Sequence, residues 1–90
     1  MEFEWDPKKA AANIRKHNVT FQEAATIFSD PLAITFEDPD HSTIENRHVT
    51  FGLSIQKRLL VVSHTERMDR SRIISARLMD RKERNIYEEG

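Results

Sequence analysis

A cluster of basic residues in the C-terminal half of the chain could bind phosphate. Residues 57–84 hold nine basic and four acidic residues, a net charge of +5, whereas residues 1–56 hold five basic and nine acidic residues, a net charge of −4. Seven of the nine bases are arginine, whose planar guanidinium group matches the geometry of a phosphate. This asymmetry predicts a basic surface for an anionic ligand, although exposed ion pairs would explain the same charges.

Side chains that exchange protons would complete the set needed to cleave a phosphodiester without a metal. Such a reaction needs a base, a cation beside the phosphoryl oxygens and an acid for the leaving group. Glu45 is the simplest base, because a carboxylate is ionised at neutral pH. His17, His64 and Tyr87 are alternatives for either proton-transfer role. Lys16 would add positive charge beside His17.

The same residues also have structural explanations. Glu45 could pair with Arg47 or cap a turn. His17 is predicted at a helix C-terminus, where the helix dipole favours its protonated form whether or not it acts in catalysis. His64 follows an apolar strand and could be a half-buried histidine with its hydrogen bonds satisfied. Tyr87 could pack in the core with its hydroxyl in water.

An acidic segment offers a different chemistry. Asp38, Asp40 and His41, with Glu45 further on, are the ligand types of a site for a hard metal ion. An acidic turn that contains Pro39 needs no metal to explain it. We therefore expect neither a metal nor another cofactor.

Composition excludes several classes of protein. The 90 residues are 38% hydrophobic and 32% charged, which predicts one globular domain over residues 1–90. The absence of cysteine excludes disulfides and thiolate metal sites and fits a reducing cytosol. The first residues do not resemble a signal peptide, and the longest apolar run, residues 59–62, is too short to cross a bilayer. We expect a cytoplasmic protein without membrane contact.

A short strand at residues 3–5 and two helices are predicted near the N-terminus. Asp6-Pro7 is typical of a helix start, and Asn18 suits the left-handed residue that ends a helix. Thr20 and Glu23 predict a capping box at the start of the second helix, which Asp30-Pro31 ends.

The rest of the chain predicts strands and a final helix. The strand segments are residues 32–36, 47–51, 59–65 and 72–78. Asp80 and Glu83 predict a capped helix that runs to about Tyr87. We summarise the order as β-α-α-β-β-β-α, an α+β fold in which three consecutive strands form an antiparallel sheet. The two N-terminal helices are expected to cover one face of that sheet.

Two arginines of the last predicted strand are the leading phosphate ligands. Arg72 and Arg77 are five residues apart, so an ideal strand would point them to opposite faces of the sheet. We therefore expect one of them to reach a given phosphate unless a bulge intervenes. Arg47 could reach the same site from the neighbouring strand.

Many short stretches, in order along the chain, resemble the BrnT family of toxins. The matching residues are Phe3–Pro7, Lys9-Ala10, Asn13, Lys16-His17, Val19, Phe21, Glu23-Ala24, Asp30-Pro31, His41-Ser42, Glu45, Arg47, Gly52, Arg58–Val62, Thr65–Arg67, Arg72–Arg77, Glu83-Arg84 and Tyr87. Asn18 and Lys57 stand where the family commonly has glycine. Both departures fall in turns and leave the candidate chemistry intact.

The resemblance implies a RelE-like fold and a type II toxin that inhibits translation and growth by cleaving RNA. It also implies a BrnA-type antitoxin that binds the toxin directly, so that the complex contacts DNA only through the antitoxin. Attack by the ribose 2′-OH would explain activity on RNA and not on DNA. The candidate catalytic residues are His17, Glu45, Arg47, Arg72, Arg77 and Tyr87. The candidate RNA-binding residues are Lys16, His64, Arg67 and Arg84.

Two other functions fit the sequence. A non-catalytic RNA- or protein-binding module would use the arginine-rich segment without an acid–base pair, and Arg72 or Arg77 would then pair with Glu66 or Glu83. A structural partner protein would bind another chain through its acidic N-terminal half. RNA binding without cleavage products would distinguish the binding module from a ribonuclease. The structural partner protein would show neither RNA affinity nor growth toxicity.

Overall fold

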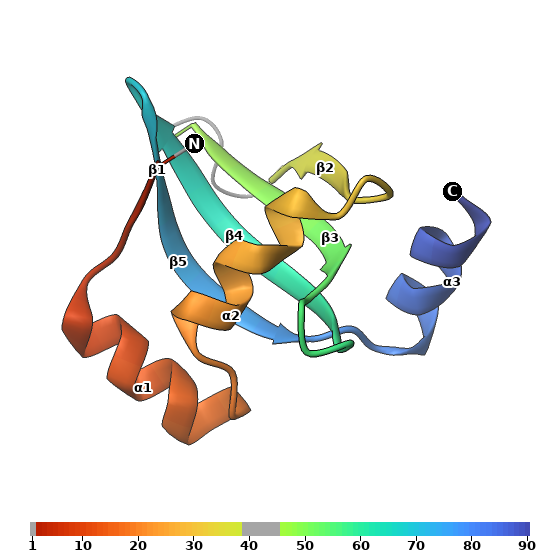
Figure 1. Ribbon diagram of the computed structural model, residues 1–90, viewed down its shortest axis with the longest axis horizontal. Coiled ribbons are helices and arrows are strands. Elements are labelled where there is room, and N and C mark those ends of the chain that lie inside the picture. The colour runs from red at the N-terminus through yellow and green to blue at the C-terminus, as the bar shows by residue number, and fades with distance from the viewer. Residues whose placement is uncertain (1, 39–45) are drawn as a thin grey trace.

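The computed structural model describes residues 2–38 and 46–90, which form one sheet and three α-helices (Figure 1). The elements are β1 (Glu2–Glu4), α1 (Pro7–His17), α2 (Phe21–Thr26), the 3₁₀ turn η1 (Ile27–Ser29), β2 (Ile34–Glu37), β3 (Arg47–Leu53), β4 (Leu59–Arg67), β5 (Arg70–Leu78) and α3 (Arg81–Glu89). No helix among the described residues is long and apolar enough to cross a membrane.

The five strands lie in the order β1-β5-β4-β3-β2. Each predicted strand segment forms a strand, so four strands follow the first two helices. The predicted order β-α-α-β-β-β-α had only three strands there and was therefore one strand short. Strands β2 to β5 pair antiparallel as expected. The sheet as a whole is mixed, because β1 pairs parallel with β5. The chain passes from β1 through α1 and α2 to the opposite edge, and the meander then returns to β1 from that edge.

Helices α1 and α2 lie over one face of the sheet, as predicted, and bury the main core. Its fully buried residues are Val19, Phe21, Ala24, Ile27, Leu60, Val62, Ile73 and Ala76. Gly52 allows η1 to approach β3, since a Cβ at this position would lie 2.9 Å from the Cβ of Ile27. The two helices and η1 therefore cover the main core on this face.

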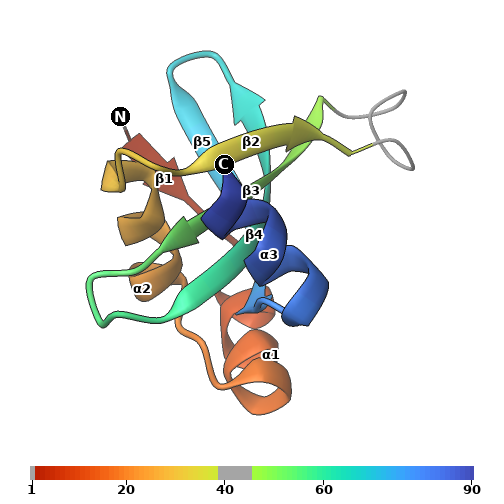
Figure 2. The ribbon, with the colours of Figure 1, turned by 90° about the vertical axis from the view of Figure 1, so that its right-hand side faces the viewer.

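Helix α3 packs on the opposite face, which the sequence had left uncovered. In Figure 1 it lies apart from α1 and α2, beyond β3, and Figure 2 shows it in front of the sheet. A second core forms there from Phe51, Val61 and Met79, with Tyr87 of α3 packed against it. Val61 lies between two residues of the main core, and alternate residues of a strand point to opposite faces. We call this second face of the sheet the α3 face.

Local signals set most of the helix ends. Asp6 caps α1 by accepting a hydrogen bond from the Lys8 amide at 2.8 Å, and Asn18 ends that helix at a φ of 57°. Asp80 and Glu83 form the predicted capping box of α3, which extends to Glu89. Thr20 caps α2 through the Glu23 amide. All three predicted helix starts are therefore confirmed.

The predicted capping box of α2 is only half formed, because tertiary contacts divert its carboxylate. Glu23 is buried and binds Arg58 and the Ser54 hydroxyl, the latter at 2.7 Å. The Arg58 contact is the first cause of the lowered pKa of Glu23. Helix α2 also ends at Thr26, before Asp30, and continues as η1. The ion pair fixes α2 to the turn between β3 and β4.

A bulge in β5 changes which face its side chains take. Ser63 pairs with Ser75 and His64 with Ile73, which leaves Ile74 as an extra residue. Ile73 and Ala76 consequently both point into the main core. Arg72 and Arg77, next to them, both point to the α3 face. The expectation for an ideal strand, that these arginines face opposite ways, does not apply, because β5 contains the bulge that was named as its exception.

Candidate functional site

Three neighbouring strands place two arginines and a threonine in one row on the α3 face. Arg47 of β3 pairs in register with Thr65 of β4, and Thr65 pairs with Arg72 of β5. Thr65 is four residues from Val61 on the same strand and therefore shares its face. Side chains paired in this way have Cβ atoms about 5 Å apart. We call Arg47, Thr65 and Arg72 the arginine row.

An acidic edge strand borders the row. Because β1 is parallel to β5, Glu4 lies opposite Arg72, and their side chains meet with an N–O distance of 3.2 Å. Arg70 contacts Glu2 and Glu4 at longer distances. These side chains are partly exposed, so the pairs are weak and an incoming phosphate can compete with them. The sequence-based alternative was a pair with Glu66, which instead lies on the other face.

Arg77 is held by α3. Its guanidinium donates two hydrogen bonds to the Glu83 carboxylate, at 2.7 and 2.8 Å. This contact is the main cause that lowers the pKa of Glu83. Arg77 pairs with Val61 and Arg72 with Thr65, so the two arginines are about 13 Å apart along the sheet. The predicted alternative of an Arg77–Glu83 pair is confirmed, and Arg77 lies outside the arginine row.

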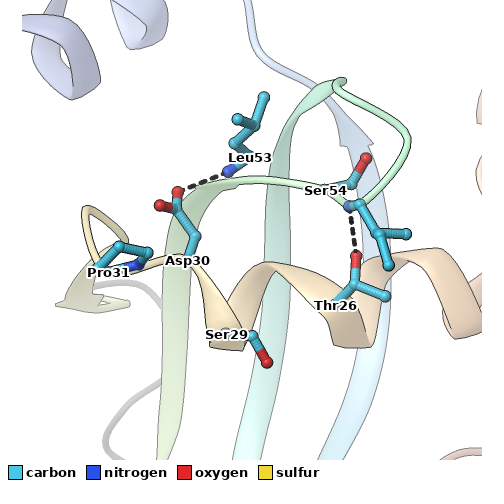
Figure 3. Close-up of a pocket in the computed structure, with 7 residues that line it drawn as sticks. Thr26, Ser29, Asp30, Pro31, Leu53 and Ser54 are labelled. Carbon is cyan, nitrogen blue, oxygen red and sulfur yellow. Dashed lines mark hydrogen bonds between the residues drawn. The ribbon is translucent and has the colours of Figure 1, made fainter.

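Tyr87 anchors α3 and does not lie in the row. Its hydroxyl donates to Asp30 at 2.5 Å, and burial together with this bond raises the pKa of Tyr87 to about 12. Asp30 also accepts hydrogen bonds from the amides of Leu32 and Leu53. Figure 3 shows the bond between Asp30 and Leu53 at the edge of a pocket of about 340 Å³. Tyr87 therefore stays neutral and has a structural partner.

His64 lies on the face covered by the helices, where it is 3% exposed. Its Nδ1 is 2.7 Å from a Glu66 oxygen and its Nε2 is 2.8 Å from the Thr50 hydroxyl. Phe28 of η1 meets the ring edge-on. Burial is the main cause of the lowered pKa of His64. The alternative prediction of a half-buried histidine with satisfied hydrogen bonds is confirmed for the hydrogen bonds, and the ring is more deeply buried than predicted.

The remaining candidates are dispersed. Lys16 and His17 end α1 and line a shallow pocket with the bulged Ile74. Arg67 is exposed next to the turn between β4 and β5. Arg84 is exposed on α3 and lines a separate pocket beside Lys57 and Arg58. The structure brings none of these four candidates, Lys16, His17, Arg67 and Arg84, into the arginine row.

Part of the predicted chemistry lies outside the described residues. Glu45, the predicted general base, is there, as are Asp40 and His41 of the alternative metal site.

Sequence reasoning also missed two residues of the site. Thr65 was noticed as part of a motif without a role, and its register beside Arg47 and Arg72 was the missing information. Glu4 gave no local signal, because its place depends on the pairing of β1 with β5.

The chain is similar to one family of known sequences and to a solved structure. The sequence model of the family described as ribonuclease toxin, BrnT, of type II toxin–antitoxin system matches residues 5–83. The crystal structure of the ribonuclease toxin BrnT from Brucella abortus aligns with a TM-score of 0.71 over 90% of this chain and 99% of that chain. At 21% sequence identity, this likeness is evidence of a shared fold. No curated protein sequence is significantly similar to the chain.

Proposed function

The chain belongs to the BrnT family of ribonuclease toxins of type II toxin–antitoxin systems, and on this premise we propose that it is a metal-independent endoribonuclease. It cleaves RNA by attack of the ribose 2′-OH on the adjacent phosphate and thereby inhibits translation and growth. We further propose that it acts in the cytoplasm as a single RelE-like domain. The toxin–antitoxin family implies an antitoxin partner, which we propose is of the BrnA type and carries the DNA-binding part of the complex.

The arginine row is the observation that supports this proposal most directly. Arg47 and Arg72 flank Thr65 on the α3 face. Two guanidinium groups at one phosphate stabilise the charge that develops on its oxygens during 2′-OH attack. Arg77, further along the same face, is suited to a neighbouring phosphate. The arrangement thus supplies the electrostatic part of catalysis without a metal.

We assign the proton-transfer roles only as far as position supports them. Glu45 precedes Arg47 by two residues in the sequence, and we propose it as the general base. Neither His17 nor Tyr87 lies in the row, and the Tyr87 hydroxyl donates a hydrogen bond to Asp30. We therefore propose that water, or a group other than these two, protonates the departing 5′-oxygen.

The test is cleavage of a labelled single-stranded RNA by antitoxin-free protein in excess EDTA. We expect wild-type cleavage to persist, because no step requires a metal. Arg72→Ala and Arg47→Ala should each slow cleavage by about 100-fold, the usual scale for loss of one group that stabilises an oxyanion. Glu45→Gln should slow it through loss of the base. Arg15→Ala is the matched control, since Arg15 is an exposed arginine on α1, on the other face.

Other results would contradict specific parts of the proposal. Loss of wild-type cleavage on addition of EDTA would rule out metal independence. Full activity in both row variants would place the site elsewhere. RNA binding without cleavage products, together with no growth arrest on expression, would favour the non-catalytic binding module. Growth arrest that a BrnA-type antitoxin fails to relieve would contradict the proposed partner.

A further inference from the structure

The central residue of the arginine row has an unusual environment. Thr65 is 5% exposed, and its hydroxyl makes no hydrogen bond with any of the described residues, 2–38 and 46–90. Buried polar side chains nearly always have a partner, so an exception asks for a physical explanation. A buried hydroxyl without a partner lowers the stability of the fold, because no hydrogen bond replaces its lost hydration.

The neighbours of Thr65 indicate what the missing partner is. Arg47 and Arg72 are paired with Thr65 on either side in the sheet, on the same face. Both flanking groups are permanently cationic, and a hydroxyl donates one hydrogen bond. A ligand that contacts the hydroxyl and both guanidinium groups at once is an anion with several acceptor oxygens. A phosphodiester group has this chemistry.

We propose that the Thr65 hydroxyl donates a hydrogen bond to a phosphoryl oxygen of the RNA between Arg47 and Arg72. The inference rests on the proposed function and adds a contact that the sequence did not assign. Arg72 is partly exposed, and Arg47 is half-buried. They contact the phosphate first, and the hydroxyl becomes accessible as they turn toward it. The unpaired hydroxyl is thus a preformed part of the RNA site.

A pair of valine substitutions distinguishes this role from a structural one. Valine has the shape of threonine without the hydroxyl. In Thr65→Val an unpaired buried hydroxyl is removed, so the melting temperature should stay the same or rise. In Thr50→Val, a control on the opposite face, the hydroxyl that bonds His64 and Thr35 is lost. The melting temperature of that variant should fall.

RNA binding and cleavage should show the reverse pattern. We measure the Kd for a 2′-O-methyl RNA, which lacks the nucleophile, and the cleavage rate of the unmodified RNA in EDTA. Thr65→Val should weaken binding about fivefold or more and slow cleavage by at least as much. Thr65→Ser keeps the hydroxyl and should recover most of both. Thr50→Val should behave as wild type in both assays while it remains folded.

Each other outcome overturns a defined claim. Wild-type binding and cleavage by Thr65→Val would show that the hydroxyl does not contact RNA. A fall in its melting temperature as large as that of Thr50→Val would show that the hydroxyl is structural. A wild-type protein that neither binds nor cleaves RNA would overturn the proposed function, and this inference with it. An active wild type with an unaffected Thr65→Val would overturn the inference alone.

Discussion

Individual side chains on the α3 face compete for the same arginines that a phosphate would bind. Glu83 meets Arg77 with both carboxylate oxygens, and Glu4 meets Arg72 with one. A carboxylate and a phosphate present similar oxygen pairs to a guanidinium group. The free protein therefore holds these arginines in ion pairs, which RNA would have to displace if it binds as we propose.

Glu83→Gln should consequently strengthen RNA binding. Glutamine preserves the size of the side chain and can fill the same capping-box position, so α3 should keep its start. The loss of one negative charge leaves Arg77 available to RNA, and we expect the Kd for RNA to fall about threefold to tenfold. The gain should shrink at high salt, because it is electrostatic. Titrations at two ionic strengths measure both effects.

The double variant Glu83→Gln/Arg77→Ala is the control for that experiment. If the gain arises from Arg77, it should disappear when Arg77 is also removed. A gain that persists in the double variant would mean that the lost charge acts on the whole face and not on Arg77. An unchanged Kd in Glu83→Gln would mean that Arg77 does not contact RNA.

At the scale of elements, α3 depends on few contacts. None of its residues is buried. Its attachments to the rest of the protein include the Arg77–Glu83 pair, the packing of Tyr87 and the bond from Tyr87 to Asp30. A helix with such shallow packing is expected to open separately from the core.

Tyr87→Phe should loosen α3 while leaving the sheet intact. The substitution removes the hydroxyl and leaves Asp30 with the amides of Leu32 and Leu53. The local free energy of opening should fall by about 1.5 to 3 kcal/mol, the usual value for a hydrogen bond to a charged group. Native-state hydrogen exchange should show faster exchange of α3 amides and unchanged β4 amides. Equal exchange in both proteins would show that the bond does not hold the helix.

The difference between local and distant contacts explains which features of the fold and of the site the sequence could predict. The helix starts at Asp6 and Asp80 follow from side chains that bond to nearby amides, and such signals lie within four residues. The parallel pairing of Glu4 with Arg72 depends on residues 68 positions apart. The bulge at Ile74 depends on how two strands fit the core. These distant contacts determine the arginine row, so its candidate arginines were predictable and its geometry was not.

At the scale of the whole molecule, one buried histidine links stability to pH. His64 is held between Glu66 and Thr50 under η1, with His48 stacked beside it. Its pKa in the folded protein is lowered from 6.5, first by burial, and the nearby His48 acts in the same direction while Glu66 opposes it. The folded state therefore binds this proton less readily than the unfolded state does.

The sign of the effect follows from this difference. Above pH 6.5 His64 is neutral in both states and folding carries no penalty from it. As the pH falls through 6.5, the unfolded chain takes up the proton first, so the free energy of unfolding falls. The slope can reach about 1.4 kcal/mol per pH unit for one proton. Glu23, Asp30 and Glu83 have lowered pKa values, so their contributions are lost only below about pH 4.5.

Urea unfolding at pH 7.5, 6.5, 5.5 and 5.0 separates the two ranges. The wild type should lose stability between pH 6.5 and 5.0, and His64→Gln, which has no ionisable side chain there, should lose less over the same interval. The slopes are compared and not the absolute stabilities, because the substitution also disturbs two hydrogen bonds. Parallel slopes would assign the loss to other groups. A steeper wild-type slope would show that the polar cluster under η1, on the face opposite the arginine row, makes the fold of this protein sensitive to mild acid.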